Sequence, residues 1–334
     1  MKIAVDAMGG DHAPSAPILG ALQAVENIED LEIVLVGDHD EITSIWKDRP
    51  RHTRVHIHHA PEVIGMGEAP VQAVRRKPDS SMVQAMRLAQ SGKADAVISA
   101  GNTGALMTAG LFVVGRMSGI ERPALSALLP VMRGWGLLLL DVGANLDPKA
   151  SQLVQYGIMG AYYCQEVYGI DNPRVGLLNV GEEPRKGTPL VRETYERLEK
   201  SGLNFVGNIE ARELLQGHAD VVVTDGFSGN IALKLTEGVA RDLMGELKGL
   251  LTQNFATKLA AYFLKDGLMA LKRRMDYQEY GGAPLLGLEQ IVYKVHGASQ
   301  SKAFNSAIRL AYNYCHKNTQ NRLRERVREE ETHL

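Results

Sequence analysis

Short runs of consecutive apolar residues recur along the whole chain, and valine, isoleucine, leucine and alanine dominate them. Runs of this kind, without alternating polar residues, are typical of strands that are covered on both faces of a sheet. We therefore expect strands in KIAVD (2–6), EIVLV (32–36), RVHIHH (54–59), ADAVIS (94–99), ALSALLPV (124–131), GLLLLDV (136–142), RVGLLNV (174–180), LNFVG (203–207) and ADVVVT (219–224).

Apolar residues at helical spacing separate many of these runs, for instance in 17–26, 80–90 and 191–200. Strands that alternate with helices predict a three-layer α/β/α sandwich with one mixed, largely parallel sheet. No low-complexity linker divides the chain, so we expect one unit rather than separate domains.

One pattern occurs twice in the same register and without a gap. ADAVISAGNTG (94–104) and ADVVVTDGFSG (219–229) both read Ala-Asp, an apolar run, a hydroxyl residue and then Gly-x-[Ser/Thr]-Gly. A fixed-register repeat at this distance indicates two related halves that share one sheet. The alternative is chance similarity between two buried strands of like composition.

In both copies the glycine motif follows a predicted strand that should end at Ser99 or Thr224. We expect a helix to begin just past the second glycine. Glycine lets a ligand approach the main chain, and the free N–H groups at a helix start favour an anion. The crevice at the carboxyl ends of strands is the usual ligand site of α/β sheets. A plain tight turn would use the same residues.

Polar residues follow the other strong strand predictions as well. Asp6 ends KIAVD, Asn145 lies in DVGAN after GLLLLD, and the segment GEEPRKGT (181–188) follows RVGLLNV. Surface turns use the same residue types, so each loop alone is weak evidence. Together, on the same side of one sheet, these loops would form a site.

The bulk composition narrows the class of protein. A net charge of −2 argues against a chain that wraps nucleic acid, so a charged partner must meet a local patch. Cys164 and Cys315 lack metal or redox spacing, as is typical of a reducing cytoplasm. The N-terminus shows no signal-peptide pattern, and glycines interrupt the uncharged stretch 96–115, which argues against a membrane span.

Motifs for cofactors and metals are incomplete. No complete G-x-G-x-x-G occurs, and GEEPRKGT has lysine and glycine exchanged relative to a nucleotide-binding P-loop. His56, His58 and His59 alternate along a strand without a carboxylate cluster, which favours a polar strand face over a metal site. We therefore expect neither a cofactor nor a metal ion.

Seven motifs occur in this order: DAMGGDHAP, SAGNTGA, DVGAN, NVGEEPRKGTP, DGFSGN, YGGAPLLG and HGAS. With them the chain closely resembles the bacterial phosphate acyltransferases, from Met1 to about Ala311. The resemblance implies a fold similar to the isocitrate and isopropylmalate dehydrogenases. It also implies one catalytic unit of two intertwined halves, approximately 1–120 with 285–334 and 121–284.

The resemblance further implies an activity. Such an enzyme makes fatty acyl phosphate from acyl carrier protein thioesters and inorganic phosphate, for phosphatidic acid and phospholipid synthesis. It is expected to be a cytoplasmic homodimer at the inner face of the membrane, and its product goes to a membrane glycerol-3-phosphate acyltransferase. Two alternatives stay open: an NAD(P)-dependent dehydrogenase on the same fold, for which we can place no nicotinamide site, and a non-catalytic phosphate-binding module.

Phosphate is a nucleophile near neutral pH and a thiolate leaves readily, so such an enzyme must mainly position phosphate and stabilise an oxyanion. Lys186, with Arg185, is the candidate for holding phosphate. Asp225 and Glu182 are candidates for orienting the lysine or accepting a proton. For residues 182–186, a solvated loop with local ion pairs is the alternative.

Asn230, Ser228 and Asn102 are the candidate donors to the oxyanion. The catalytic residues we expect are thus Lys186, Asp225, Asn230 and Glu182. The expected contacts to phosphate or thioester are Gly101, Asn102, Thr103, Gly104, Gly226, Ser228, Gly229, Asp6, Asn145 and Arg185.

The segment 248–275 stands out by its charge, because six basic residues oppose the single acid Asp266. Apolar residues recur at helical spacing on either side of Asp266-Gly267, which predicts a projecting helical hairpin that breaks there. We expect it to meet the acidic carrier protein and a membrane surface. The alternative is that its apolar stripe packs inside the dimer. The expected contact residues are Phe255, Lys258, Leu259, Lys265, Lys272, Arg273 and Arg274.

Overall fold

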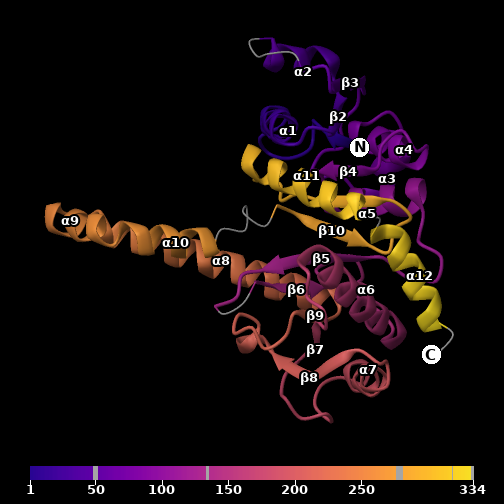
Figure 1. Cartoon of the computed structure of the whole chain (residues 1–334), viewed down its shortest axis with the longest axis vertical. Coiled ribbons are helices and arrows are strands. Elements are labelled where there is room, and N and C mark those ends of the chain that lie inside the picture. The colour runs from indigo at the N-terminus through magenta and orange to yellow at the C-terminus, as the bar shows by residue number, and fades with distance from the viewer. Residues whose placement is uncertain (48–51, 133–134, 276–280, 318, 332–334) are drawn as a thin grey trace.

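The computed structural model describes residues 1–47, 52–132, 135–275, 281–317 and 319–331, with their side chains except at 272–275 and 328–331. One eleven-stranded sheet runs through the protein with helices on both faces, and most neighbouring strands are parallel (Figure 1). The predicted α/β/α sandwich with one mixed, largely parallel sheet is therefore confirmed.

Each of the nine predicted apolar runs contains a strand. The sequence analysis missed β10 and β11, which are four residues each, because APLL and IVYK contain only two Val, Ile or Leu residues apiece. The strands are β1 (Lys2–Asp6), β2 (Glu32–Gly37), β3 (Val55–His59), β4 (Ala96–Ser99), β5 (Ala124–Leu129), β6 (Leu137–Leu140), β7 (Arg174–Asn179), β8 (Asn204–Glu210), β9 (Val221–Val223), β10 (Ala283–Leu286) and β11 (Ile291–Lys294).

The helices at 17–26, 80–90 and 191–200 are also present, as α1, α4 and α7. The α-helices are α1 (Ser15–Asn27), α2 (His39–Trp46), α3 (Pro70–Arg76), α4 (Ser81–Gln90), α5 (Thr103–Ala109), α6 (Ala150–Tyr168), α7 (Pro189–Glu199), α8 (Gly226–Leu251), α9 (Phe255–Phe263), α10 (Lys265–Met275), α11 (Ser301–His316) and α12 (Thr319–Glu331). A π-helical turn (Gly110–Val114) continues α5, and a short 3₁₀ helix (Ala211–Glu213) follows β8.

Successive strand residues face two different hydrophobic cores, as the alternation of side chains along a strand requires. In β1, Ile3 and Val5 belong to one core, while Ala4 belongs to the other. The first core lies under α1, α6, α11 and α12, and the second lies under α4 and α5. Because both faces are covered, the strands read as uninterrupted apolar runs, which is why the sequence revealed them.

Strand directions change in the middle of the sheet. Its order is β3-β2-β1-β4-β11-β10-β5-β6-β9-β7-β8, and the three successive steps from β11 to β6 are antiparallel. The strands β3 to β11 on one side therefore run opposite to β6, β9, β7 and β8 on the other. The polar loops of the two halves thus leave at opposite edges of the sheet, and not on the same side.

The repeated sequence pattern occupies equivalent places in the two halves. β4 lies parallel to β1, which ends in the buried Asp6, and β9 lies parallel to β6, which is followed by the buried Asp141. The helix after each repeat starts earlier than expected, because α5 begins at Thr103 and α8 at Gly226. The second glycine of each motif therefore lies within the first helical turn, and not before the helix.

Helices α8, α9 and α10 form an arm that extends far from the sheet (Figure 1). The arm agrees with the predicted projecting hairpin, but its breaks differ. Asp266 and Gly267 lie inside α10, and the chain turns at 252–254 and at Leu264 instead. Asn254 explains the first break, since its side chain caps α9 by accepting from the Thr257 N–H. No helix among the described residues is long and apolar enough to cross a membrane.

The start of α8 offers a test of this packing. A methyl group at Gly229 would lie 1.9 Å from the main-chain oxygen of Asp141, whereas one at Gly238, on the same helix, would meet nothing within 4 Å. We expect Gly229→Ala to lower the free energy of unfolding by about 1–3 kcal/mol or more, because the backbone must move. Gly238→Ala should raise it by about 0.5–1 kcal/mol through helix propensity. Denaturant unfolding of both variants measures this, and an unchanged Gly229→Ala midpoint would contradict the packing.

Candidate functional site

A cleft of about 470 Å³ opens in the centre of the molecule, where β5 and β10 part. The backbone pairing of β10 with β5 joins Leu285 to Leu125 and Leu286 to Ala124, while the other end of β10 pairs with β11. Ser126 bridges the parting strands by donating from its hydroxyl to the Pro284 carbonyl. The parts of β5 and β10 that do not pair with each other thus form walls of the cleft.

Segments from both halves reach this cleft although their strands run in opposite directions. Thr103 and Gly104 line it from the first glycine motif, and Asn230, which directly follows the second motif, lines it from α8. The central strands are only four to six residues long, so that roughly 13–20 Å separates the two edges of the sheet. The remaining wall residues include Asp11, Gly143, Lys294, His296 and Ser299.

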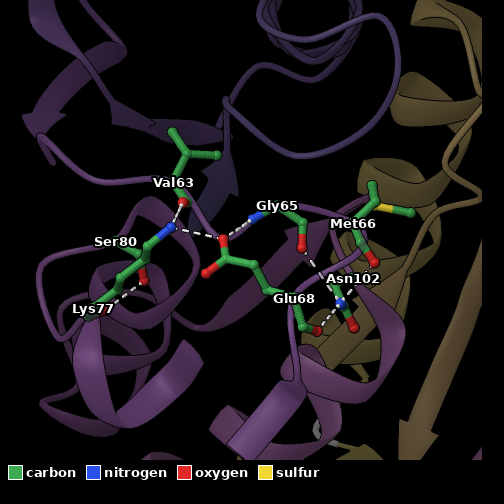
Figure 2. A network of polar contacts seen from close by, with 7 residues as sticks. All are labelled: Val63, Gly65, Met66, Glu68, Lys77, Ser80 and Asn102. Atoms are coloured by element: carbon green, nitrogen blue, oxygen red, sulfur yellow. Dashed lines mark hydrogen bonds and ion pairs between the residues drawn. The ribbon is translucent and has the colours of Figure 1, made fainter. Parts of the chain in front are cut away.

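The side chain of Asn102, in the first motif, is bound to a neighbouring segment (Figure 2). Its amide nitrogen donates to the carbonyl oxygens of Met66 at 2.9 Å and Glu68 at 3.0 Å, and its oxygen caps α5 by accepting from the Ala105 N–H. An asparagine amide has two N–H donors, so both are occupied by this segment. Asn102 therefore fixes the loop in place.

The same segment is held from its far side by Lys77 (Figure 2). The Lys77 ammonium donates to Glu68 at 2.6 Å and to the Val63 carbonyl at 2.8 Å. Hydrogen bonds from Lys77 and from the Gly65 N–H lower the pKa of the Glu68 carboxyl. The wall around Met66 is thus tied to the start of α5 by a continuous chain of polar contacts.

Asp6 organises the base of the first glycine motif. Its carboxylate accepts from the Ser99 hydroxyl at 2.6 Å and from the Met8 N–H at 3.2 Å, and burial raises its pKa. A methyl group at Gly9 would lie 2.7 Å from both this carboxylate and the Gly101 nitrogen. Glycine at position 9 therefore permits the loops after β1 and β4 to touch. The described hydrogen bonds of Asp6 thus hold the segments after β1 and at the end of β4 together.

Asp141 performs the equivalent task in the second half. Its carboxylate accepts from the backbone N–H groups of Leu125, Gly143, Ala144 and Asn145, and burial raises its pKa to about 6. The amide of Asn145 is occupied as well, because it donates to the Pro123 carbonyl and to the Tyr156 hydroxyl.

The second motif forms the first turn of α8. Asp225 caps this helix by accepting from the Ser228 N–H at 2.8 Å, and Gly226 and Gly229 are buried against the 141–145 loop. Asn230 donates one amide hydrogen to the Val142 carbonyl at 2.9 Å and lines the cleft. Since an asparagine amide has two hydrogens, Asn230 keeps a second donor for a ligand.

The loop that follows β7 lies apart from the residues that line the cleft. Glu182, Arg185 and Lys186 are exposed there, and the Lys186 ammonium is 3.8 Å from Glu183. Asn208 fixes the loop by donating to the carbonyls at 182 and 183. The local ion pair that we considered as the alternative is therefore present, and the catalytic roles of Glu182, Arg185 and Lys186 stay predictions.

The cleft also contains residues that the sequence analysis did not select. They are Asp11, Glu237, Lys294, His296 and Ser299. His296 to Ser299 are the HGAS motif, which we used for the resemblance but not as a site. They reach the cleft because β11, a strand that was not expected, inserts beside β4. The sequence did contain a signal for this part of the site, because the polar, glycine-containing segment 296–299 follows the short, mostly apolar run 291–295.

The arm residues are exposed where they can be described. Phe255 is 82% exposed, Leu259 is 48% exposed, and Lys258 and Lys265 are exposed. The side chains of Lys272, Arg273 and Arg274 lie outside the described part of α10. In the described part of the chain no group of three or more histidine, cysteine, aspartate or glutamate side chains could hold a metal ion.

Comparison with solved structures shows which proteins share this fold. A phosphotransacetylase from Streptococcus pyogenes superposes with a TM-score of 0.62 at 19% identity, over 95% of this chain and 94% of that one. A 4-hydroxythreonine-4-phosphate dehydrogenase from Klebsiella pneumoniae gives a TM-score of 0.52 at 14% identity, over 93% and 98%. At these identities the likeness shows a shared fold, and it agrees with the dehydrogenase-like fold expected from the sequence.

The sequence comparisons are more specific. The model of the family described as "Fatty acid synthesis protein" matches residues 1–322. The phosphate acyltransferase of Bacillus licheniformis is 56% identical over 311 residues, which is 93% of each chain. This chain therefore belongs to the phosphate acyltransferase family of fatty acid synthesis proteins.

Proposed function

We propose that this chain transfers a long-chain fatty acyl group from acyl carrier protein to inorganic phosphate, and so makes acyl phosphate for phospholipid synthesis. The observation that carries the proposal is the central cleft, which is lined by Thr103 and Gly104 of the first glycine motif and by Asn230, the residue that directly follows the second. One part of its wall is polar, with Thr103 and Lys294, and another part is apolar, with Leu125, Leu128 and Leu233. An anion and an acyl chain can thus lie side by side there.

The reaction needs little covalent help from the protein. A phosphate oxygen attacks the thioester carbonyl carbon, the carbon–sulfur bond breaks, and the thiolate leaves on the carrier. Negative charge gathers on the carbonyl oxygen between these events, so a fixed N–H donor in the cleft accelerates the step. The second amide hydrogen of Asn230 is suited to this role.

The direct test is product formation. The purified protein, incubated with phosphate and palmitoyl carrier protein, should give a product that hydroxylamine traps as the hydroxamate, in an amount that depends on phosphate. Thioester loss without phosphate dependence would contradict the proposal. Phosphate binding without turnover would favour the non-catalytic module, and nicotinamide reduction would favour a dehydrogenase.

Lys186 does not line the described cleft, so its predicted role in holding phosphate is an alternative to a phosphate site inside the cleft and has a test of its own. If its ammonium holds phosphate during the reaction, Lys186→Ala should raise the Michaelis constant for phosphate about tenfold or more, since a hydrogen bond to a charged group contributes about 1.5–3 kcal/mol. The melting temperature should hardly change, because the side chain is exposed. Lys200→Ala, at an exposed position that ends α7, is the matched control. Unchanged turnover in Lys186→Ala would remove this residue from the site.

The arm supports a second part of the proposal, in which this enzyme is a homodimer in the cytoplasm that touches the inner face of the membrane. Apolar residues follow one side of α8 toward the tip, with Leu235 and Leu243 both 65% exposed and Val239 49% exposed. A two-fold partner that covers this stripe would remove them from water.

The tip of the arm differs from α8 in combining aromatic and basic residues. Phe255 is 82% exposed, and Tyr262 and Phe263 are 71% and 78% exposed. Exposed aromatics beside lysines suit an interfacial helix on anionic lipid, and lysines alone suit an acidic carrier protein. Contact with the membrane would deliver acyl phosphate to a membrane glycerol-3-phosphate acyltransferase.

Two variants separate these roles of the arm. Leu259→Glu should release the protein from anionic vesicles, because it places a charge in the apolar face. Lys272→Glu/Arg273→Glu should raise the Michaelis constant for the carrier substrate, more strongly at low salt. The double variant Lys93→Glu/Lys200→Glu, at exposed sites elsewhere, controls for the same change in net charge. Light scattering on each variant measures the dimer. Dissociation of the dimer with unchanged vesicle binding and kinetics would make the arm a packing element instead.

A further inference from the structure

Lys294 is a buried cation in the wall of the cleft, at the carboxyl end of β11. Its neighbours across the sheet are Ser99 of β4 on one side and Ala283 of β10 on the other. Only 8% of the residue is exposed, yet it lines the cleft. A lysine in such a place is unusual, because moving an ammonium group out of water is costly unless a charge or a ligand compensates.

The contacts of Lys294 satisfy its ammonium only in part. The ammonium donates to the main-chain carbonyls of Ala100 and Val295, the first at 3.2 Å. An ammonium has three N–H donors, and the described residues accept two of them, so one is left for a ligand. Ala100 directly precedes the first glycine motif, and Thr103 and Gly104 of that motif line the same cleft as Lys294.

No carboxylate neutralises this charge by direct contact in the described part of the chain. Asp6 from β1 and Asp11 from the following loop attract Lys294 electrostatically, but neither forms a salt bridge with it. The carboxylate of Asp6 is engaged by Ser99 and by the Met8 N–H. The other titratable residues of the cleft are His296, Lys234 and Glu237.

We propose that Lys294 binds the phosphate acceptor in the cleft and is thereby a substrate-binding residue. The proposal rests on the proposed function for the identity of the anion. It assigns phosphate to the side of the cleft formed by β4 and β11, next to the first glycine motif. The acyl chain then lies on the opposite side, along Leu125 and Leu128 of β5 and Leu233 of α8.

The protonation of Lys294 gives this assignment a distinctive consequence. Burial lowers the pKa of the ammonium to about 8. The group is therefore charged at neutral pH and loses its charge as the pH rises through about 8, whereas an exposed lysine would stay charged. Phosphate affinity should weaken over the same range. An arginine stays protonated over this pH range. In Lys294→Arg, the loss of phosphate affinity should therefore disappear or move to higher pH.

The first experiment measures the binding of inorganic phosphate alone, by calorimetry, in the full chain. Lys294→Met keeps the length of the side chain and removes its charge. It should raise the dissociation constant for phosphate tenfold or more. In turnover it should raise the Michaelis constant for phosphate while leaving that for the acyl carrier substrate unchanged. Lys317→Met is the matched control, because Lys317 donates to the Glu166 carbonyl and does not line the cleft.

The second experiment follows the dissociation constant of wild-type protein for phosphate from pH 8 to 9.5, where phosphate is mainly the dianion and its own charge changes little, and needs no variant to fold. A dissociation constant for phosphate that does not change across this range overturns the proposal. A Lys294→Met variant with a lowered melting temperature and normal phosphate binding also overturns it, because Lys294 would then only stabilise the packing of β11 against β4. Wild-type protein that binds phosphate through Lys294 but makes no acyl phosphate would refute the proposed function and leave this site intact.

Discussion

The pairing between β10 and β5 is the interaction on which the rest of the structure depends. These two short strands join the halves of the sheet, and their pairing is limited to Leu285 with Leu125 and Leu286 with Ala124. Where it stops, the cleft begins. A longer ladder would close the centre of the sheet, and no ladder would leave two separate sheets. This pairing is antiparallel, and together with the antiparallel steps on either side it reverses the strand direction and so sends the two sets of loops to opposite edges.

Two buried carboxylates keep the walls of this cleft in place. Asp6 binds the loops after β1 and β4, and Asp141 binds four N–H groups around the loop after β6. Burial raises the pKa of both groups, which shows that each is held in the protein at a cost in desolvation. Fixed loops are what such chemistry requires, because donors that are already oriented need not reorganise during the reaction.

The arm is connected directly to the cleft, because both contain residues of helix α8. The glycine motif after β9 forms the first turn of α8, and this helix, 26 residues long in all, leads out of the body of the molecule (Figure 1). Helix α8 therefore links the cleft to the turn at 252–254, after which α9 forms the exposed tip. Helix α9 has no buried residue, so its sequence is free of core packing and can suit an external surface.

The sequence by itself determined most of the sheet and three well-patterned helices, since strands covered on both faces carry uninterrupted apolar runs. It also determined the repeated glycine motif and the family. It did not determine β10 and β11, because four residues, one of them Pro284, give too little periodicity. For the same reason it did not indicate Lys294, whose burial follows from the position of β11 between β4 and β10.

Only the tertiary structure decided which polar residues share the cleft. Asn102 and Asn145 look like ligand-binding side chains in sequence, yet their amides are occupied by carbonyl and hydroxyl groups far away along the chain. Asn230 has the same chemistry and keeps a free donor at the cleft. A local motif records which groups a residue carries, whereas its partners depend on contacts between distant segments. Those contacts are set by the order and direction of the strands.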